Sequence, residues 1–159
     1  MTGVEKVAEY LEKAKIFYLL TAEDGKPSGR PFTFFLVENG DIIFLTGQHK
    51  KVYQQMKKNP HVELLASDAG SFMRIDGEAE FFEDDSMWDK IVAREPLIPR
   101  LYNDETGFKV ALFRLKHAKV EIGGAVKIQD SFDLNSYNGQ RFSPLLIFNI
   151  LFSVFGKLE

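Results

Sequence analysis

"RPFTFFLVENGDIIFLTGQHKKVYQQMKKNP", residues Arg30 to Pro60, contains the patterns that decide the fold. An aromatic run over 30–37 and an apolar run over 42–46 flank Asn39-Gly40, a dipeptide typical of tight hairpin turns. Pro31 has no N–H to give to a neighbouring strand, so the first run is expected at a sheet edge or beside a bulge. The stretch therefore predicts an antiparallel hairpin.

A short helix is predicted between this hairpin and Pro60. Val52 and Met56 are four residues apart and share one face, and Asn59-Pro60 ends the helical pattern. Thr46 stands just ahead and is expected to cap the helix.

The predicted helix begins with two lysines, Lys50 and Lys51, where the helix dipole is already positive. Backbone N–H groups, the Thr46 hydroxyl, the Gln48 amide and two ammonium groups would converge there. These are the groups that a phosphate monoester needs. The alternative is a solvated basic patch, because two further lysines lie at the far end of the same helix.

Upstream, the sequence predicts a helix and a second hairpin. Apolar residues recur at helical spacing over Val4–Lys15, and "IFYLLT" at 16–21 is typical of a buried strand. Asp24-Gly25 supplies the turn that leads into the aromatic run.

Downstream, strand patterns dominate. Strands are expected over 62–66, over 72–82 with a bulge at Gly77, and over 110–122 as one long strand or two. A helix is expected over 84–95. About six short strands with hairpin links and few helices predict a mainly β protein with helices (α+β), a small antiparallel Greek-key split barrel.

Composition excludes several classes of function. The chain has 159 residues, 45% of them hydrophobic, a net charge of -3 and no Cys. This argues against general nucleic-acid binding and excludes disulfides, thiol catalysis and iron–sulfur clusters. The three histidines are scattered, so no metal is expected, and no Gly-x-Ser-x-Gly, Gly-x-Gly-x-x-Gly or Walker motif occurs. The N-terminus lacks a signal-peptide pattern, so a cytoplasmic location is expected.

The C-terminal stretch "SPLLIFNILFSVFGKLE", 143–159, is apolar almost all round. Ser143 is expected to cap a helix with Pro144 in its first position. At this length it is too short to cross a bilayer. Packing on its own or a partner subunit is favoured over a membrane-surface anchor, which would carry more Lys and Arg. The predicted domains are 1–125, the cofactor-binding barrel, and 126–159, a C-terminal extension.

The ordered segments "AKIFYLLTAEDGKPSGRPFTFF" and "IIFLTGQHKKVYQQMKKNPHVELLA" resemble the FMN-binding split-barrel proteins related to pyridoxamine 5'-phosphate oxidase. The closer likeness is to the branch named for nitroimidazole resistance, and it runs from about Val4 to Ile122. The resemblance implies FMN as cofactor and a homodimer with the flavin sites at the subunit interface.

The resemblance also implies roles for individual residues. By position, 30–33 would run along the isoalloxazine and ribityl chain, Leu45 and Thr46 would offer backbone and hydroxyl contacts, and the paired lysines would hold the phosphate. Phe72 stands where the oxidase has a Gln near the ring. The candidate cofactor-binding residues are Arg30, Pro31, Phe32, Thr33, Leu45, Thr46, Gln48, Lys50, Lys51 and Phe72.

The late Trp and Arg positions of the oxidase have no counterpart in this sequence, so true pyridoxamine phosphate oxidase activity is not expected. The sequence predicts an FMN-dependent oxidoreductase that reduces small electron-poor, nitroimidazole- or quinone-like compounds, with NADH or NADPH as a possible donor. The catalytic residues stay unknown. The alternatives are a non-catalytic flavin-binding stress protein and a protein of this fold that uses haem or a deazaflavin.

Overall fold

The computed structural model describes residues 1–134, so the predicted helix at 143–159 lies outside the described residues. The helices are α1 (Gly3–Ala14), α2 (Lys51–Lys58), the 3-10 turn η1 (Asp85–Met87), α3 (Trp88–Arg94) and α4 (Ile98–Leu101). The strands are β1 (Phe17–Glu23), β2 (Lys26–Phe32), β3 (Phe35–Glu38), β4 (Asp41–Gly47), β5 (His61–Asp68), β6 (Ser71–Phe82), β7 (Val110–Gly124) and β8 (Ile128–Asp133).

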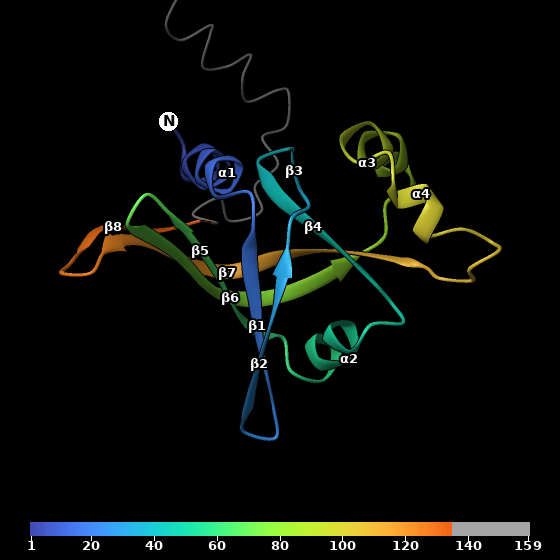
Figure 1. The fold of residues 1–159 in the computed structure, drawn as a ribbon, viewed down its shortest axis with the longest axis horizontal. Coiled ribbons are helices and arrows are strands. Elements are labelled where there is room, and N and C mark those ends of the chain that lie inside the picture. Colours follow the sequence, from blue (N-terminus) through green and yellow to red (C-terminus); the bar gives the residue numbers. More distant parts are fainter. Residues whose placement is uncertain (135–159) are drawn as a thin grey trace, which may run out of the picture.

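One eight-stranded antiparallel sheet forms the molecule, in the order β2-β1-β5-β6-β7-β4-β3 with β8 beside β7. It twists strongly, and α1 and α2 lie on different sides of β1 (Figure 1). Aromatic rings from β1, β4 and β7 meet in its core, where Phe44 stacks on Phe113 at 5.4 Å and meets Phe17 edge-on at 5.7 Å. The predicted fold class is confirmed.

The described strands do not form a closed barrel. Within residues 1–134, β2 pairs with β1 alone and β3 pairs with β4 alone, so no strand ladder closes the sheet into a ring. The arrangement is that of a split barrel, and the predicted edge position of Pro31 is confirmed.

Two predicted elements differ from the structure. The aromatic run 30–37 is divided at Thr33 and Phe34, because the chain leaves its partner β1 there and continues beside β4. Thr46 does not cap α2: it belongs to β4 opposite Ala111, and the N-cap residue is Lys50.

The turns and the bulge follow the predictions. Asn39 and Gly40 have φ of 51° and 80°, and Asp24 and Gly25 have φ of 51° and 75°, as left-handed hairpin turns require. The register between β6 and β7 shifts at Gly77.

The sheet continues past residue 125, where the sequence suggested a domain boundary. β8 pairs with β7, and Leu134 is buried in the main core. In residues 1–134 no helix has the length and apolar character needed to span a membrane.

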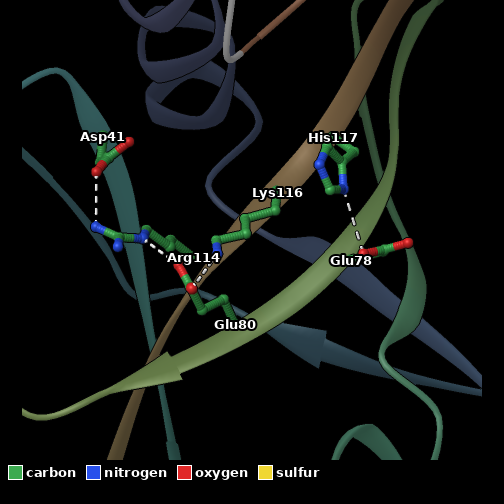
Figure 2. Close-up of polar contacts among 6 residues, drawn as sticks. All are labelled: Asp41, Glu78, Glu80, Arg114, Lys116 and His117. Carbon is green, nitrogen blue, oxygen red and sulfur yellow. Dashed lines mark hydrogen bonds and ion pairs between the residues drawn. The ribbon is translucent and has the colours of Figure 1, made fainter. Parts of the chain in front are cut away.

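A charged network covers the outer surface of β4, β6 and β7. Arg114 donates from Nε to Glu80 at 2.7 Å and from Nη1 to Asp41 at 3.0 Å, and Lys116 contacts the second oxygen of Glu80 (Figure 2). The hydrogen bond from Lys116, with that from Arg114, holds the pKa of Glu80 below its ordinary value. The network ties together three strands that are far apart in the sequence.

Candidate functional site

Near the end of β4, the side-chain hydroxyl of Thr46 is buried in an environment that offers it no hydrogen bond within residues 1–134. Thr46 is 2% exposed, and its Oγ1 has no hydrogen-bond partner among the described residues. Most buried polar groups are paired, and leaving one unpaired costs about 1–3 kcal/mol. A group that accepts or donates a hydrogen bond here would remove that cost.

The N-cap of α2 lies four residues beyond this hydroxyl. Lys50 is the N-cap, has extended backbone and makes no side-chain cap hydrogen bond with the described residues. The Lys50 and Lys51 side chains are both exposed, and the first turn of α2 contains no acidic residue. The positive end of the helix therefore faces solvent together with two ammonium groups.

The segment between β4 and α2 is held against the start of β7. The backbone N–H of Gln48 donates to the Lys109 carbonyl at 2.9 Å, and the Gln48 side chain reaches the Val110 carbonyl at 3.4 Å. The ring of His49 stacks on Phe108 with centroids 3.7 Å apart. These contacts fix the direction in which the chain enters α2.

Arg30 lies under the middle of α2 rather than beside its start. Its guanidinium donates to the Leu19 carbonyl, to the hydroxyls of Thr21 and Ser28, and to the Gln55 amide oxygen at 2.6 Å. Burial lowers the pKa of the Arg30 guanidinium, which nevertheless remains charged.

The other predicted residues fall in several places. Pro31 and Thr33 are exposed, and Phe32 is half-buried and meets Phe113 edge-on at 6.2 Å. Leu45 is buried in a second core beside α3.

Phe72 lies near the opposite end of β6 from Phe81, about 30 Å away along the strand. Phe81 is the residue that meets α2, through Tyr53 at 4.8 Å. Thr46, Gln48, Lys50 and Lys51 therefore lie in one segment, from the end of β4 to the start of α2, whereas Phe72 of the same subunit lies apart.

A cavity of about 730 Å³ adjoins this region and shares Gln48 with it. Its walls come from α2, the end of β6, α3 and the start of β7, and they combine aromatic rings with charged groups. The main lining side chains are Tyr53, Lys57, Phe81, Phe82, Asp84, Trp88 and Lys109.

Sequence reasoning missed Gln55 and the α3 wall of the cavity. Gln55 is 3% exposed and shares the buried face of α2 with Val52 and Met56. The signal was an amide at helical spacing inside an otherwise apolar face. The α3 wall left no comparable signal, because its place in the cavity depends on tertiary packing. In residues 1–134, no group of three or more His, Asp or Glu side chains is placed to hold a metal ion.

Comparison with known proteins gives one family match. The family described as Pyridoxamine 5'-phosphate oxidase matches residues 4–126. No curated protein matches the chain.

Several solved structures share the fold. A NimC/NimA family protein from Clostridium acetobutylicum is 24% identical, with a TM-score of 0.73 over 83% of this chain and 94% of that one. A haem-binding protein from Mycobacterium smegmatis is 18% identical, with a TM-score of 0.62 over 86% of this chain and 60% of the other. A pyridoxamine 5'-phosphate oxidase-related, FMN-binding protein from Nostoc punctiforme is 18% identical, with a TM-score of 0.52 over 74% and 81%.

Proposed function

The chain belongs to the pyridoxamine 5'-phosphate oxidase family, and we propose that it binds FMN with the phosphate at the start of α2. The observation that carries this proposal is the hydroxyl of Thr46, which is buried and has no hydrogen-bond partner in residues 1–134. It lies four residues before the N-cap of α2, a helix that begins with two exposed lysines. The FMN-binding relative from Nostoc punctiforme supports the choice of cofactor.

The charge balance at this helix end favours an anion. Each lysine costs about 0.3–1 kcal/mol against the helix dipole. A phosphate about 4 Å from an ammonium group would gain about 4 kcal/mol at a partly screened site. Binding of a phosphate would therefore outweigh the cost of Lys50 and Lys51 several-fold.

We further propose that the protein is an oxidoreductase acting on small electron-poor compounds, nitroimidazole- or quinone-like. When bound, the flavin supplies hydride or electron transfer, and the protein supplies binding and orientation. The cavity beside Gln48 has the aromatic side chains that a flat acceptor needs, among them Tyr53 from α2 and Trp88 from α3. The solved NimC/NimA relative is the similarity that favours this acceptor class.

We also propose that the protein is a homodimer with each flavin between two subunits. Tyr18 is 48% exposed and lies beside Pro31 and Leu65 on the outer face of β1, β2 and β5. Such a face favours contact with a second subunit. A partner's Phe72 would then reach a site from which this subunit's Phe72 is too distant.

A visible absorption spectrum of the purified protein tests the cofactor. Flavin bands that sharpen on binding are expected. A haem spectrum would instead favour a protein of this fold that uses haem, the alternative supported by the haem-binding relative from Mycobacterium smegmatis. Anaerobic reduction by NADH or NADPH, with and without a nitroimidazole or quinone, tests turnover. If the flavin stays oxidised with both donors, a non-catalytic flavin-binding stress protein is the alternative that remains.

A further inference from the structure

We propose that Trp88 is the surface on which a flat ligand ring stacks in the cavity beside Gln48, and that this ligand is neutral or positively charged rather than anionic. That the ligand is the electron acceptor rests on the proposed function. The binding itself depends only on the described side chains, so it is tested without turnover.

Trp88 lies where two cavities meet. The larger cavity, of about 730 Å³, and a smaller one of about 350 Å³ are both lined by Trp88, Lys109 and Val110. The two spaces therefore adjoin at the start of α3 and the start of β7. A ring placed against the indole in the larger cavity has room for a substituent in the smaller one.

The other three aromatic rings of the larger cavity already have a cation nearby. The Lys57 ammonium lies 6.0 Å from the ring centroid of Tyr53 and 5.8 Å from that of Phe81, and these two rings meet edge-on at 4.8 Å. The Arg114 guanidinium lies 5.3 Å from the ring centroid of Phe82. A ligand that stacked on any of these rings would have to displace a protein group.

Trp88 differs from these rings, because its indole is held in place but has no such partner. It is the first residue of α3, and its backbone N–H donates to the Asp85 carbonyl of η1. Its neighbours Met87 and Ile91 are buried and anchor this segment. Trp88 itself is 38% exposed, and within residues 1–134 no ring and no cation lies against it. A pre-positioned, open aromatic face binds a flat ring at little entropic cost.

The charges around the two cavities disfavour an anion. Two lysines stand against four carboxylates, and within the described part of the chain no ion pair joins them: Lys57, Lys109, Glu83, Asp84, Asp85 and Asp104. Asp85 lies three residues before Trp88 and so on the same side of this helical segment. A positively charged substituent on the stacked ring would meet a carboxylate there. NADPH, with its anionic phosphates, would have to bind elsewhere.

The first experiment uses fluorescence, because the chain has one Trp and its emission reports on Trp88 alone. The probes share a ring and a nitro group but differ in charge: para-nitrobenzylamine, para-nitrobenzyl alcohol and para-nitrobenzoate. The amine and the alcohol should quench saturably without shortening the fluorescence lifetime. The benzoate should bind at least about threefold more weakly than the alcohol. Quenching that never saturates, or tightest binding of the benzoate, would overturn the proposal.

The second experiment measures affinities by calorimetry, on the protein with FMN bound and without it. Trp88→Leu should weaken the amine and the alcohol about 2- to 12-fold, because the stacking contact is lost. Leu101→Ala is the control, since Leu101 is 59% exposed on α4 and lines neither cavity. Unchanged affinity in Trp88→Leu would overturn the proposal. If Trp88→Leu does not fold, Trp88→Phe, with its smaller ring, should weaken binding about twofold, and no loss would count against the proposal.

The charge preference has its own pair of variants. Asp85→Asn should weaken nitrobenzylamine about 1.5- to 5-fold and leave nitrobenzyl alcohol unchanged, because only the amine carries a charge. Asp89→Asn is the matched control: it removes the same charge four residues further along, at a position that lines neither cavity. An equal loss for both ligands, or the same loss in both variants, would contradict the charge preference.

Two further readouts separate the possible failures. Light scattering should show the same self-association for Trp88→Leu as for wild type, and a weakened complex would place the indole in a subunit contact and overturn the proposal. In the FMN-loaded protein, Trp88→Leu should raise the KM for nitrobenzylamine more than it lowers kcat. If the wild-type protein bound no flavin, the proposed function would fail, while the titrations would still decide whether a flat ring binds Trp88.

Discussion

The Thr46 hydroxyl and the Thr21 hydroxyl are both buried, but within residues 1–134 the first has no hydrogen-bond partner and the second has three. Thr46→Val removes an unsatisfied group at almost constant volume. We expect the flavin-free protein to gain about 1 kcal/mol, or about 2–4 °C in melting temperature. FMN should bind about 2- to 12-fold more weakly, because one neutral hydrogen bond is lost.

The matched control is Thr21→Val, which breaks the hydrogen bonds to Gln55 and Arg30 and should lower the melting temperature. Calorimetry and flavin titration measure both effects. A destabilised Thr46→Val protein with unchanged FMN affinity would mean that this hydroxyl does not face a ligand.

Lys51 is the residue whose charge is expected to contact the phosphate. Lys51→Ala should remove a charge-assisted contact of about 1.5–3 kcal/mol and weaken FMN about ten- to a hundredfold. Riboflavin, which lacks the phosphate, should be little affected. Lys58→Ala is the control, because it removes the same charge about 10 Å away at the other end of α2. Equal losses for both ligands would contradict the phosphate assignment.

At the level of elements, the bulge between β6 and β7 depends on two neighbouring backbones. His117 has φ of 49° and its side chain is 80% exposed, while a Cβ on Gly77 would lie 3.1 Å from the Lys116 carbonyl. His117→Val should destabilise by about 1–2 kcal/mol, because a β-branched residue fits the left-handed region poorly. His117→Asn should be nearly neutral. Denaturant titration of the two variants checks this, and equal stability would show that the bulge relaxes.

The charged network on β4, β6 and β7 predicts a pH dependence. The pKa of Glu80 is lowered in the folded protein, so its contribution is present above the unfolded value of about 4.3 and is lost as the pH falls through the folded value. Glu80→Gln should cost about 1 kcal/mol at pH 7, since the group is partly exposed. The difference in melting temperature from wild type should shrink towards zero near pH 3. A difference that is the same at both pH values would show that ionisation of Glu80 does not contribute.

Local turn chemistry made the hairpins predictable. Asn39-Gly40 and Asp24-Gly25 require left-handed backbone, and short-range patterns reveal such positions directly. The break at Thr33 was not predictable in the same way, because it depends on a change of partner strand from β1 to β4. Strand partners far apart in the sequence leave no local signal.

At the scale of the whole molecule, the proposed dimer predicts a surface variant. Tyr18→Lys places a charge on the outer face shared with Pro31 and Leu65, and should weaken self-association at least tenfold. Val126→Lys, at a position that is 96% exposed, is the control and should leave the dimer intact. Light scattering over a concentration series measures both. A wild-type monomer that holds FMN with full affinity would contradict the interface site.

In the candidate site, as in the fold, local features could be predicted from the sequence and long-range contacts could not. Lys50, Lys51 and Thr46 could be predicted because they lie in one short segment of sequence. The buried contact from Arg30 to Gln55 joins β2 to α2 across the core, and the position of Phe72 relative to α2 depends on the whole length of β6. Both are properties of the assembled sheet.

The pairing of β4 with β7 has a consequence for protein synthesis. Phe44 lies opposite Phe113, so about 70 more residues must be synthesised after β4 before it can pair with β7. At about 5–20 residues per second this delay is about 4–14 s, during which the edge of β4 that does not pair with β3 has no partner strand from its own chain. Nascent chains arrested before residue 110 should therefore be the ones that chaperones retain, and those arrested well beyond it should be protease-resistant.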